Sequence, residues 1–167
     1  MTELRDGEIL LRPYTESDVP ALTALCQDPD VQRRIDLPVP YGASDALEYI
    51  SRVETTRAIV DARTGELLGS IGWRLVDQEN VQIGYWIGSD FRRRGIATRA
   101  LRLLSRWALT ELATGRVQLL TEPDNEASQR VAEKAGFERE GLLRRYVRLG
   151  DGSRRDGIMF SVLPEDL

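Results

Sequence analysis

The chain of 167 residues contains no histidine, so it lacks the commonest general base and the commonest zinc ligand. A Ser-His-Asp triad is therefore excluded. Cys26 is the single cysteine, which excludes an internal disulfide and fits a reducing cytoplasmic location. Because Cys26 falls on the apolar side of an expected helix, we predict a packing role for it, not a nucleophilic one.

Long apolar runs are also missing, and the first six residues do not have the form of a signal peptide. We therefore expect no membrane partner. Lys134 is the only lysine, so almost all the positive charge is arginine, and the net charge is −4. A mildly acidic chain argues against a module that binds nucleic acid by charge. The length predicts one domain over residues 1–167.

An arginine-rich stretch from Phe91 to Thr98 is the most informative part of the chain. It follows an alternating, strand-like run over residues 81–87 and opens an amphipathic helix that begins near Gly95. The first turn of a helix has unpaired N–H groups that favour an anion, and glycine lets a ligand approach the backbone. The stretch therefore predicts a phosphate-binding loop. Its spacing alone also fits a solvated basic turn.

A second pattern follows the loop and its helix. The apolar run over residues 117–120 is typical of a buried strand. Asn125 is a good N-cap and Gly136 a good residue just past a helix end, so a short helix is predicted between them. The order is therefore strand, phosphate loop, helix, strand, capped helix and strand.

This series resembles the GNAT superfamily of acyl-CoA-dependent N-acetyltransferases over nearly the whole chain. Within it the chain is most similar to the RimJ/RimL branch. The residues behind that finer resemblance are Leu11-Arg12-Pro13 with Asp18, Ile83-Gly84-Tyr85-Trp86, Asn125-x-x-Ser128 and Arg155-Asp156. It implies an α/β (α+β) fold with a single mixed central sheet of about seven strands, splayed between the fourth and fifth, and about four helices.

The remaining elements are expected around this centre. Further strands are predicted over residues 8–12, 57–61 and 67–76, and a C-terminal hairpin over 142–149 and 155–163 that turns at Gly150-Asp151-Gly152. Helices are predicted over residues 15–27, where Thr15 and Asp18 resemble a capping box, and 44–53, with Ser44 as the cap. Asp28-Pro29-Asp30 is expected to break the first helix.

The resemblance implies acetyl-CoA as co-substrate and no metal. Its pyrophosphate would lie over the loop and first helical turn, on Arg92, Arg93, Arg94, Gly95, Ile96, Ala97 and Thr98. Its pantetheine amides would pair with the backbone of Trp86, Ile87 and Gly88. Asn125 occupies a position that often contacts the cofactor in the family, although it is also a plain helix cap, and both roles stay open.

Direct attack by the amine in a ternary complex is the reaction that the resemblance implies. Ser128 is the expected general acid, because Ala132 stands where many members carry a tyrosine. Ser128 also fits an ordinary helix-start serine, and Tyr146 is a weaker candidate. Gln82 stands where the branch often has glutamate, so it is expected to orient a water. The base stays unassigned among Glu79, Asp90, Glu122 and Asp156.

Two functions are compatible with these residues. The first is an N-acetyltransferase that acts on a protein N-terminus or an amine-bearing small molecule. The alternative is a catalytically weak or inactive acyl-CoA-binding module for sensing or interaction, which the Gln82 and Ala132 positions allow. A nucleotide-binding P-loop protein is a poor third alternative, since there is no Gly-Lys-Ser/Thr. The sequence leaves a homodimer open.

Overall fold

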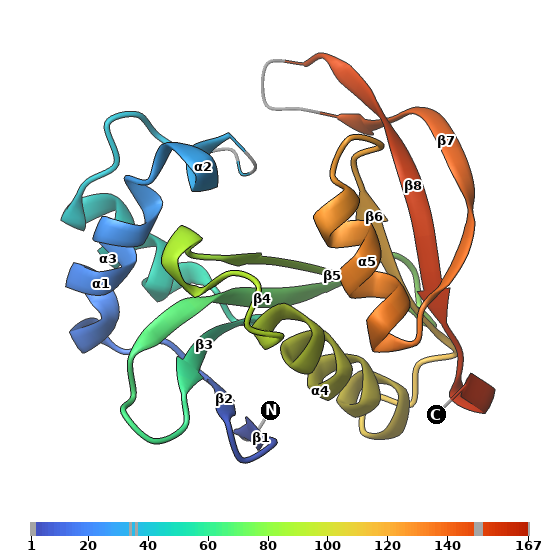
Figure 1. Ribbon diagram of the computed structural model, residues 1–167, viewed down its shortest axis with the longest axis horizontal. Coiled ribbons are helices and arrows are strands. Elements are labelled where there is room, and N and C mark those ends of the chain that lie inside the picture. Colours follow the sequence, from blue (N-terminus) through green and yellow to red (C-terminus); the bar gives the residue numbers. More distant parts are fainter. Residues whose placement is uncertain (1–2, 34, 36, 149–151, 167) are drawn as a thin grey trace. The chain divides into compact units, whose positions relative to one another are not determined.

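The computed structural model describes residues 3–33, 35, 37–148 and 152–166 (Figure 1). Within these residues it has eight strands and five helices. The strands are β1 (Leu4–Arg5), β2 (Ile9–Arg12), β3 (Thr56–Asp61), β4 (Leu67–Leu75), β5 (Asn80–Ile87), β6 (Arg116–Thr121), β7 (Glu138–Arg148) and β8 (Arg154–Val162). The helices are α1 (Val19–Cys26), α2 (Pro29–Gln32), α3 (Ala43–Arg52), α4 (Ile96–Thr110) and α5 (Glu126–Ala135).

The strands follow the order β1-β2-β3-β4-β5-β6-β8-β7 in one mixed sheet. The fold is the one expected, with the two-residue β1 and the short α2 added. β5 and β6 pair in parallel from Asn80 with Arg116 to Ile83 with Leu119. The ladder ends there, although β5 continues to Ile87 and β6 to Thr121. This end of the ladder agrees with the splay expected between these two strands.

The residues cluster into two compact units, Met1–Gly72 with Tyr85–Ala100 and Trp73–Gly84 with Leu101–Leu167. The expectation of one domain over residues 1–167 stays a prediction. Each unit is described by itself below. The turn predicted at Gly150-Asp151-Gly152 falls largely outside the described residues, as does Leu149.

In the first unit, α1 and α3 pack on a core that Trp86 of β5 also contacts. Its buried members are Leu22, Cys26, Tyr41, Ala46, Ala58, Val60 and Leu67. Cys26 is only 2% exposed, and burial raises its pKa to about 11, so the thiol stays protonated at neutral pH. The packing role expected for Cys26 is confirmed.

Two helix starts in this unit differ from the sequence-based expectation. The break predicted at Asp28-Pro29-Asp30 is confirmed, because α1 ends at Cys26, but Pro29 also begins α2, which was not expected; proline at the first helical position loses no hydrogen bond. Asp28 caps that helix by accepting a bond from Asp30 N at 2.8 Å. The next helix, α3, is capped at Gly42, where Asp45 accepts a bond from Gly42 N at 2.7 Å. Ser44 therefore lies inside the helix.

The capping box predicted at Thr15 and Asp18 is present and includes an arginine. Asp18 accepts two bonds of 2.7 Å from Arg12 and one of 2.8 Å from Thr15 N. Burial alone would raise the pKa of Asp18, but these bonds outweigh it and hold the pKa below its ordinary value. Asp18 thus joins β2 to the start of α1 as a buried carboxylate.

We expect Asp18→Asn to lower the free energy of unfolding by about 3 kcal/mol at pH 7, because it leaves the Arg12 charge poorly compensated. A carboxylate with a lowered folded pKa stabilises the fold above its unfolded pKa of about 3.9, and that contribution is lost as the pH falls through the folded value. The difference between variant and wild type in urea unfolding should therefore shrink below about pH 4.

Glu48→Gln provides the matched control, since Glu48 forms an exposed i,i+4 pair with Arg52. It should cost no more than about 0.5 kcal/mol. An Asp18→Asn effect as small as this control would contradict the role given to Asp18.

Candidate active site

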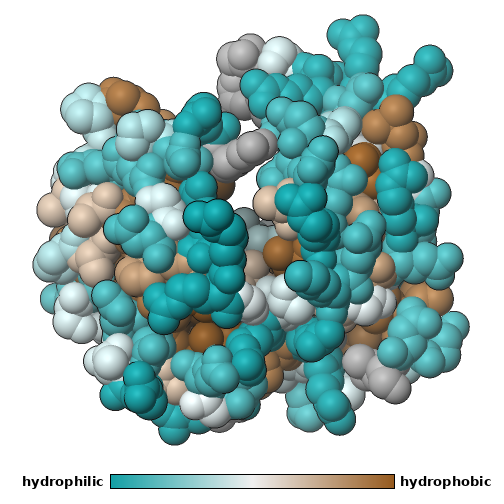
Figure 2. Space-filling view, viewed as in Figure 1, coloured by the Kyte–Doolittle hydropathy of each residue, from teal (hydrophilic) through white to brown (hydrophobic). Residues whose placement is uncertain are grey.

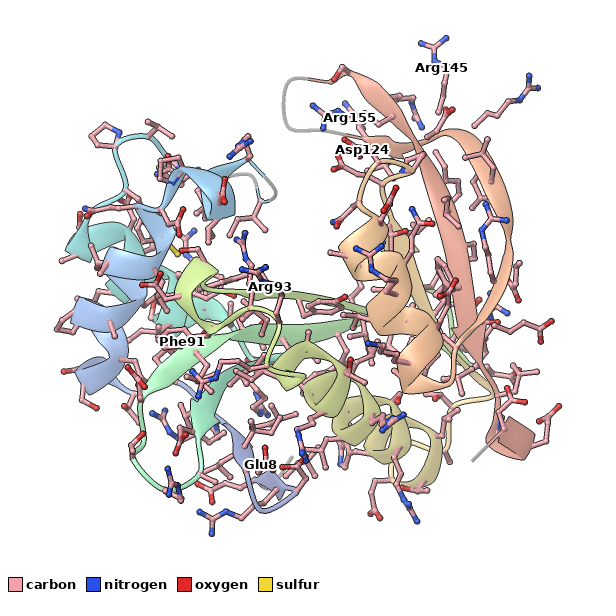
Figure 3. All side chains as sticks on the ribbon, in the orientation of Figure 1. Glu8, Phe91, Arg93, Asp124, Arg145 and Arg155 are labelled. Atoms are coloured by element: carbon pink, nitrogen blue, oxygen red, sulfur yellow. The ribbon has the colours of Figure 1, made fainter. Side chains whose placement is uncertain are left out.

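The segment between β5 and α4 has the backbone of an anion-binding loop. β5 ends at Ile87, a short 3-10 turn covers Ser89–Phe91, and Arg92 is extended. Arg93 and Gly95 then both have left-handed backbones, with φ of 60° and 77°. Left-handed backbone is uncommon outside glycine, so Arg93 marks a constrained turn. Figure 3 labels Phe91 and Arg93 on this loop.

The start of α4 leaves N–H groups available to a ligand. The first bond of the helix runs from Arg99 N to Gly95 O at 3.1 Å, so the N–H groups of the four preceding residues have no acceptor within the helix. A Cβ built on Gly95 would have no atom within 4 Å. The space beside Gly95 is thus open, and an anion there would meet these N–H groups and the positive end of the helix dipole.

The three loop arginines have different surroundings. The Arg92 guanidinium donates to Ile87 O at 3.1 Å and lies 3.4 Å from a carboxylate oxygen of Asp30. Arg94 lies with its guanidinium carbon 5.9 Å from the Phe91 ring centroid. Arg93 and Arg94 are exposed. Arg92 therefore stabilises the loop through its contacts with Ile87 and Asp30. The exposed Arg93 and Arg94 are better placed to reach a phosphate.

The backbone at the end of β5 is closely packed against β4. A Cβ on Gly69 would lie 2.3 Å from Trp86 O, so only glycine fits there. Gly88 N donates to Leu68 O at 3.0 Å, and Gly88 O accepts from Phe91 N at 3.0 Å. Both polar groups of Gly88 thus have partners within the chain, and the carbonyl of Ile87 also has one, since it accepts from Arg92 Nε at 3.1 Å.

In the second unit, Gln82 lies within a row of polar side chains across the sheet. Its Oε1 atom accepts from Arg74 Nη2 at 3.0 Å and from Gln118 Nε2 at 3.4 Å. Arg116 Nε donates to Gln118 Oε1 at 3.4 Å and pairs with Glu140 at 2.5 and 2.6 Å. Because Oε1 already has two donors, Gln82 can offer a ligand or water only its amide N–H groups.

The helix α5 has the caps that the sequence predicted. Asn125 Oδ1 accepts from Ser128 N at 3.2 Å, and Gly136 has a left-handed backbone with φ of 95°. The cap role of Asn125 is thereby confirmed. Ser128 is half-buried in the first turn, and Ala132, one turn later, is fully buried. Position 132 therefore faces the protein interior, on the same side of α5 as Ser128.

The other candidate groups differ in their surroundings. Glu122 pairs with Arg155 at 2.7 Å, and Asp156 accepts a bond of 2.7 Å from Arg145 N (Arg145 and Arg155 are labelled in Figure 3). Glu79 and Asp90 are exposed. Tyr146 is 48% exposed on β7, where the hairpin carries exposed arginines and its visible face is largely hydrophilic (Figure 2).

Sequence reasoning missed Arg74 and Gln118 as neighbours of Gln82. Arg74 is found only from the register of the β4–β5 hairpin, in which Val76 N donates to Asn80 O at 2.8 Å. Counting two residues along each strand places Arg74 opposite Gln82. Among the described residues there is no group of three or more potential metal ligands. In the same part of the chain, no helix has the length and apolarity that a membrane span requires.

The sequence matches the family model "Acetyltransferase (GNAT) domain" over residues 8–138. The chain belongs to this family. It is an acetyl-CoA-dependent N-acetyltransferase, with the expected similarity to RimJ/RimL proteins. The uncharacterized N-acetyltransferase p20 of Bacillus licheniformis is 28% identical over 99% of this chain and 98% of its own length.

Two further relatives bear on the branch. YdaF of Bacillus subtilis, which is named as a ribosomal N-acetyltransferase, is 36% identical over 61% of this chain and 56% of its own. The structure of Mycobacterium smegmatis RimJ in complex with CoA-disulfide superposes with a TM-score of 0.79 at 25% identity. That match covers 99% of this chain and 88% of RimJ.

Proposed function

We propose that this acetyltransferase moves the acetyl group of acetyl-CoA to a primary amine, most suitably the N-terminus of a protein or peptide. The observation that carries the cofactor assignment is the open space at left-handed Gly95, beside the first turn of α4. The resemblance to YdaF and to RimJ supports an N-terminal amine as acceptor. A binding module without turnover has no comparable support.

In the proposed reaction the neutral amine attacks the thioester carbonyl carbon, the C–S bond breaks, and the departing sulfur takes a proton. Ser128 is proposed as the donor of that proton. The pyrophosphate is assigned to the N–H groups over residues 95–98 and to Arg93 and Arg94. The backbone of Trp86 and Ile87 is assigned to the pantetheine amides. Asn125, which caps α5, stays assigned as a cofactor contact as well.

Gln82 is proposed to hold a water that accepts the proton of the amine. Its Oε1 accepts from Arg74 and Gln118, so the amide N–H would donate to this water and leave a lone pair on the water oxygen for the proton. An α-amine with a pKa of roughly 8 needs only such a weak base.

The test is release of free CoA thiol from acetyl-CoA with short peptides that have free N-termini, with mass spectrometry of the acetylated product. The rate should rise with pH and level off near the pKa of each acceptor amine. A midpoint near pH 6 that is the same for every amine would instead indicate an enzyme carboxylate as base. Absence of release and of acetylated product with every peptide and small amine would overturn the proposed function.

A further inference from the structure

Arg74 lies next to Gln82 and carries a positive charge that takes part in no ion pair among the described residues. It is exposed on β4 and donates from Nη2 to Gln82 Oε1 at 3.0 Å. No carboxylate among the described residues forms an ion pair with its guanidinium. The hydrogen bond to a neutral amide holds the guanidinium beside Gln82 without neutralising it.

Arg116, in the same polar row, shows the contrast. Its guanidinium makes a bidentate pair with Glu140, which also accepts from Ser161 Oγ at 2.7 Å. The hydrogen bond from Arg116, with the further one from Ser161, lowers the pKa of Glu140. The Arg116 end of the row is therefore electrically balanced, and the Arg74 end carries a net positive charge.

A positive charge beside Gln82 is unfavourable for a cationic acceptor and favourable for an anionic one. A guanidinium presents several N–H donors in a plane, and the bond to Gln82 uses only one of them. The remaining donors match the two oxygens of a carboxylate. Because Gln82 is neutral, no carboxylate at position 82 competes for them.

We infer that Arg74 forms a subsite for a carboxylate that the acceptor carries a few bonds from its amine. This inference rests on the proposed function, in which the amine is deprotonated near Gln82. The chemical class is an amine with a nearby carboxylate. An aspartate or glutamate next to a peptide N-terminus has this chemistry, as does the α-carboxylate of a free amino acid.

The experiment compares kcat/KM for peptides that differ only at the second residue, which is aspartate, asparagine or lysine after an N-terminal serine. The wild type should favour aspartate over asparagine by roughly fivefold, which is the upper range for a solvent-accessible ion pair, and lysine should be the poorest. The preference should weaken as salt is added. Free serine compared with serinamide tests the α-carboxylate as the source of the charge.

Three variants assign the preference to Arg74. Arg74→Gln should bring the aspartate-to-asparagine ratio close to one, and Arg74→Lys should keep much of it. Gln82→Glu should reduce the ratio to one or below, because the new carboxylate occupies Arg74. Arg106→Gln makes the same charge change on the exposed side of α4 and should keep the wild-type ratio.

A wild-type ratio near one, or a ratio that survives in Arg74→Gln, would overturn the subsite even though the enzyme is active. If no peptide is acetylated, the proposed function fails separately. The affinities of the aspartate and asparagine peptides for the CoA-bound protein, measured by calorimetry, then test the subsite by themselves. Arg74 should still make the aspartate peptide bind more tightly. Thermal unfolding of each variant checks that it folds. If Arg74→Gln does not fold, the Arg74→Lys variant provides the second test of the subsite.

Discussion

Gly95→Asp is expected to weaken acetyl-CoA binding by at least about 100-fold in calorimetry. A side chain at position 95 would project into the open space beside the first turn of α4, where the proposed pyrophosphate lies. A carboxylate about 4 Å from a phosphate oxygen costs about 4 kcal/mol in surroundings of intermediate polarity. The added charge, more than the added volume, should therefore abolish binding.

Two variants separate this effect from backbone strain. Gly65 lies in the β3–β4 turn with φ of 75°, also with no atom within 4 Å of a built Cβ. Gly65→Asp thus imposes the same strain and charge away from the loop, and it should lose similar stability but keep its affinity. Gly95→Asn matches the shape of aspartate without its charge and should bind better than Gly95→Asp. If the folded Gly95→Asp variant keeps wild-type affinity, the loop does not hold the pyrophosphate.

The parts of this molecule that local rules govern were predictable from the sequence. The cap at Asn125 and the left-handed end at Gly136 define α5 because each depends only on neighbouring backbone groups. The loop before α4 was predictable for the same reason. Pro29 shows the limit of such rules, because proline can both follow the end of one helix and begin the next, and only the first of these roles was predicted.

Contacts between strands were not predictable in this way. The bond between Arg74 and Gln82 depends on the hairpin register, and the bond from Gly88 N to Leu68 O depends on how β5 ends beside β4. Each of these two bonds changes which atoms of a candidate site residue can contact a ligand. The Oε1 atom of Gln82 already accepts hydrogen bonds from two neighbours. The backbone N–H and carbonyl of Gly88 each already have a partner within the chain. Residue identity alone therefore gave candidates for the site, and the pairing determines which of their atoms remain available.

Ser128→Ala is expected to lower kcat by about 100-fold, the lower end of the range for general acid catalysis, because water can replace a lost proton donor. Affinity for acetyl-CoA should stay near wild type. The substitution suits the helix, since alanine has the highest helix propensity and the backbone N–H of residue 128 can still donate to Asn125. A loss of rate would therefore not arise from unfolding of α5.

Changing the pKa of the leaving thiol provides the sharpest control for the assignment of Ser128 as the general acid. A general acid matters most when the thiolate leaves unassisted only with difficulty, so an acetyl donor whose thiol has a much lower pKa should need Ser128 less. The Ser128→Ala defect should then shrink with such a donor, whereas a merely structural defect would persist with both donors. Tyr146→Phe tests the weaker candidate on β7, and it should keep nearly full turnover if Ser128 is the acid. Wild-type turnover in Ser128→Ala, combined with a large loss in Tyr146→Phe, would transfer the role to Tyr146.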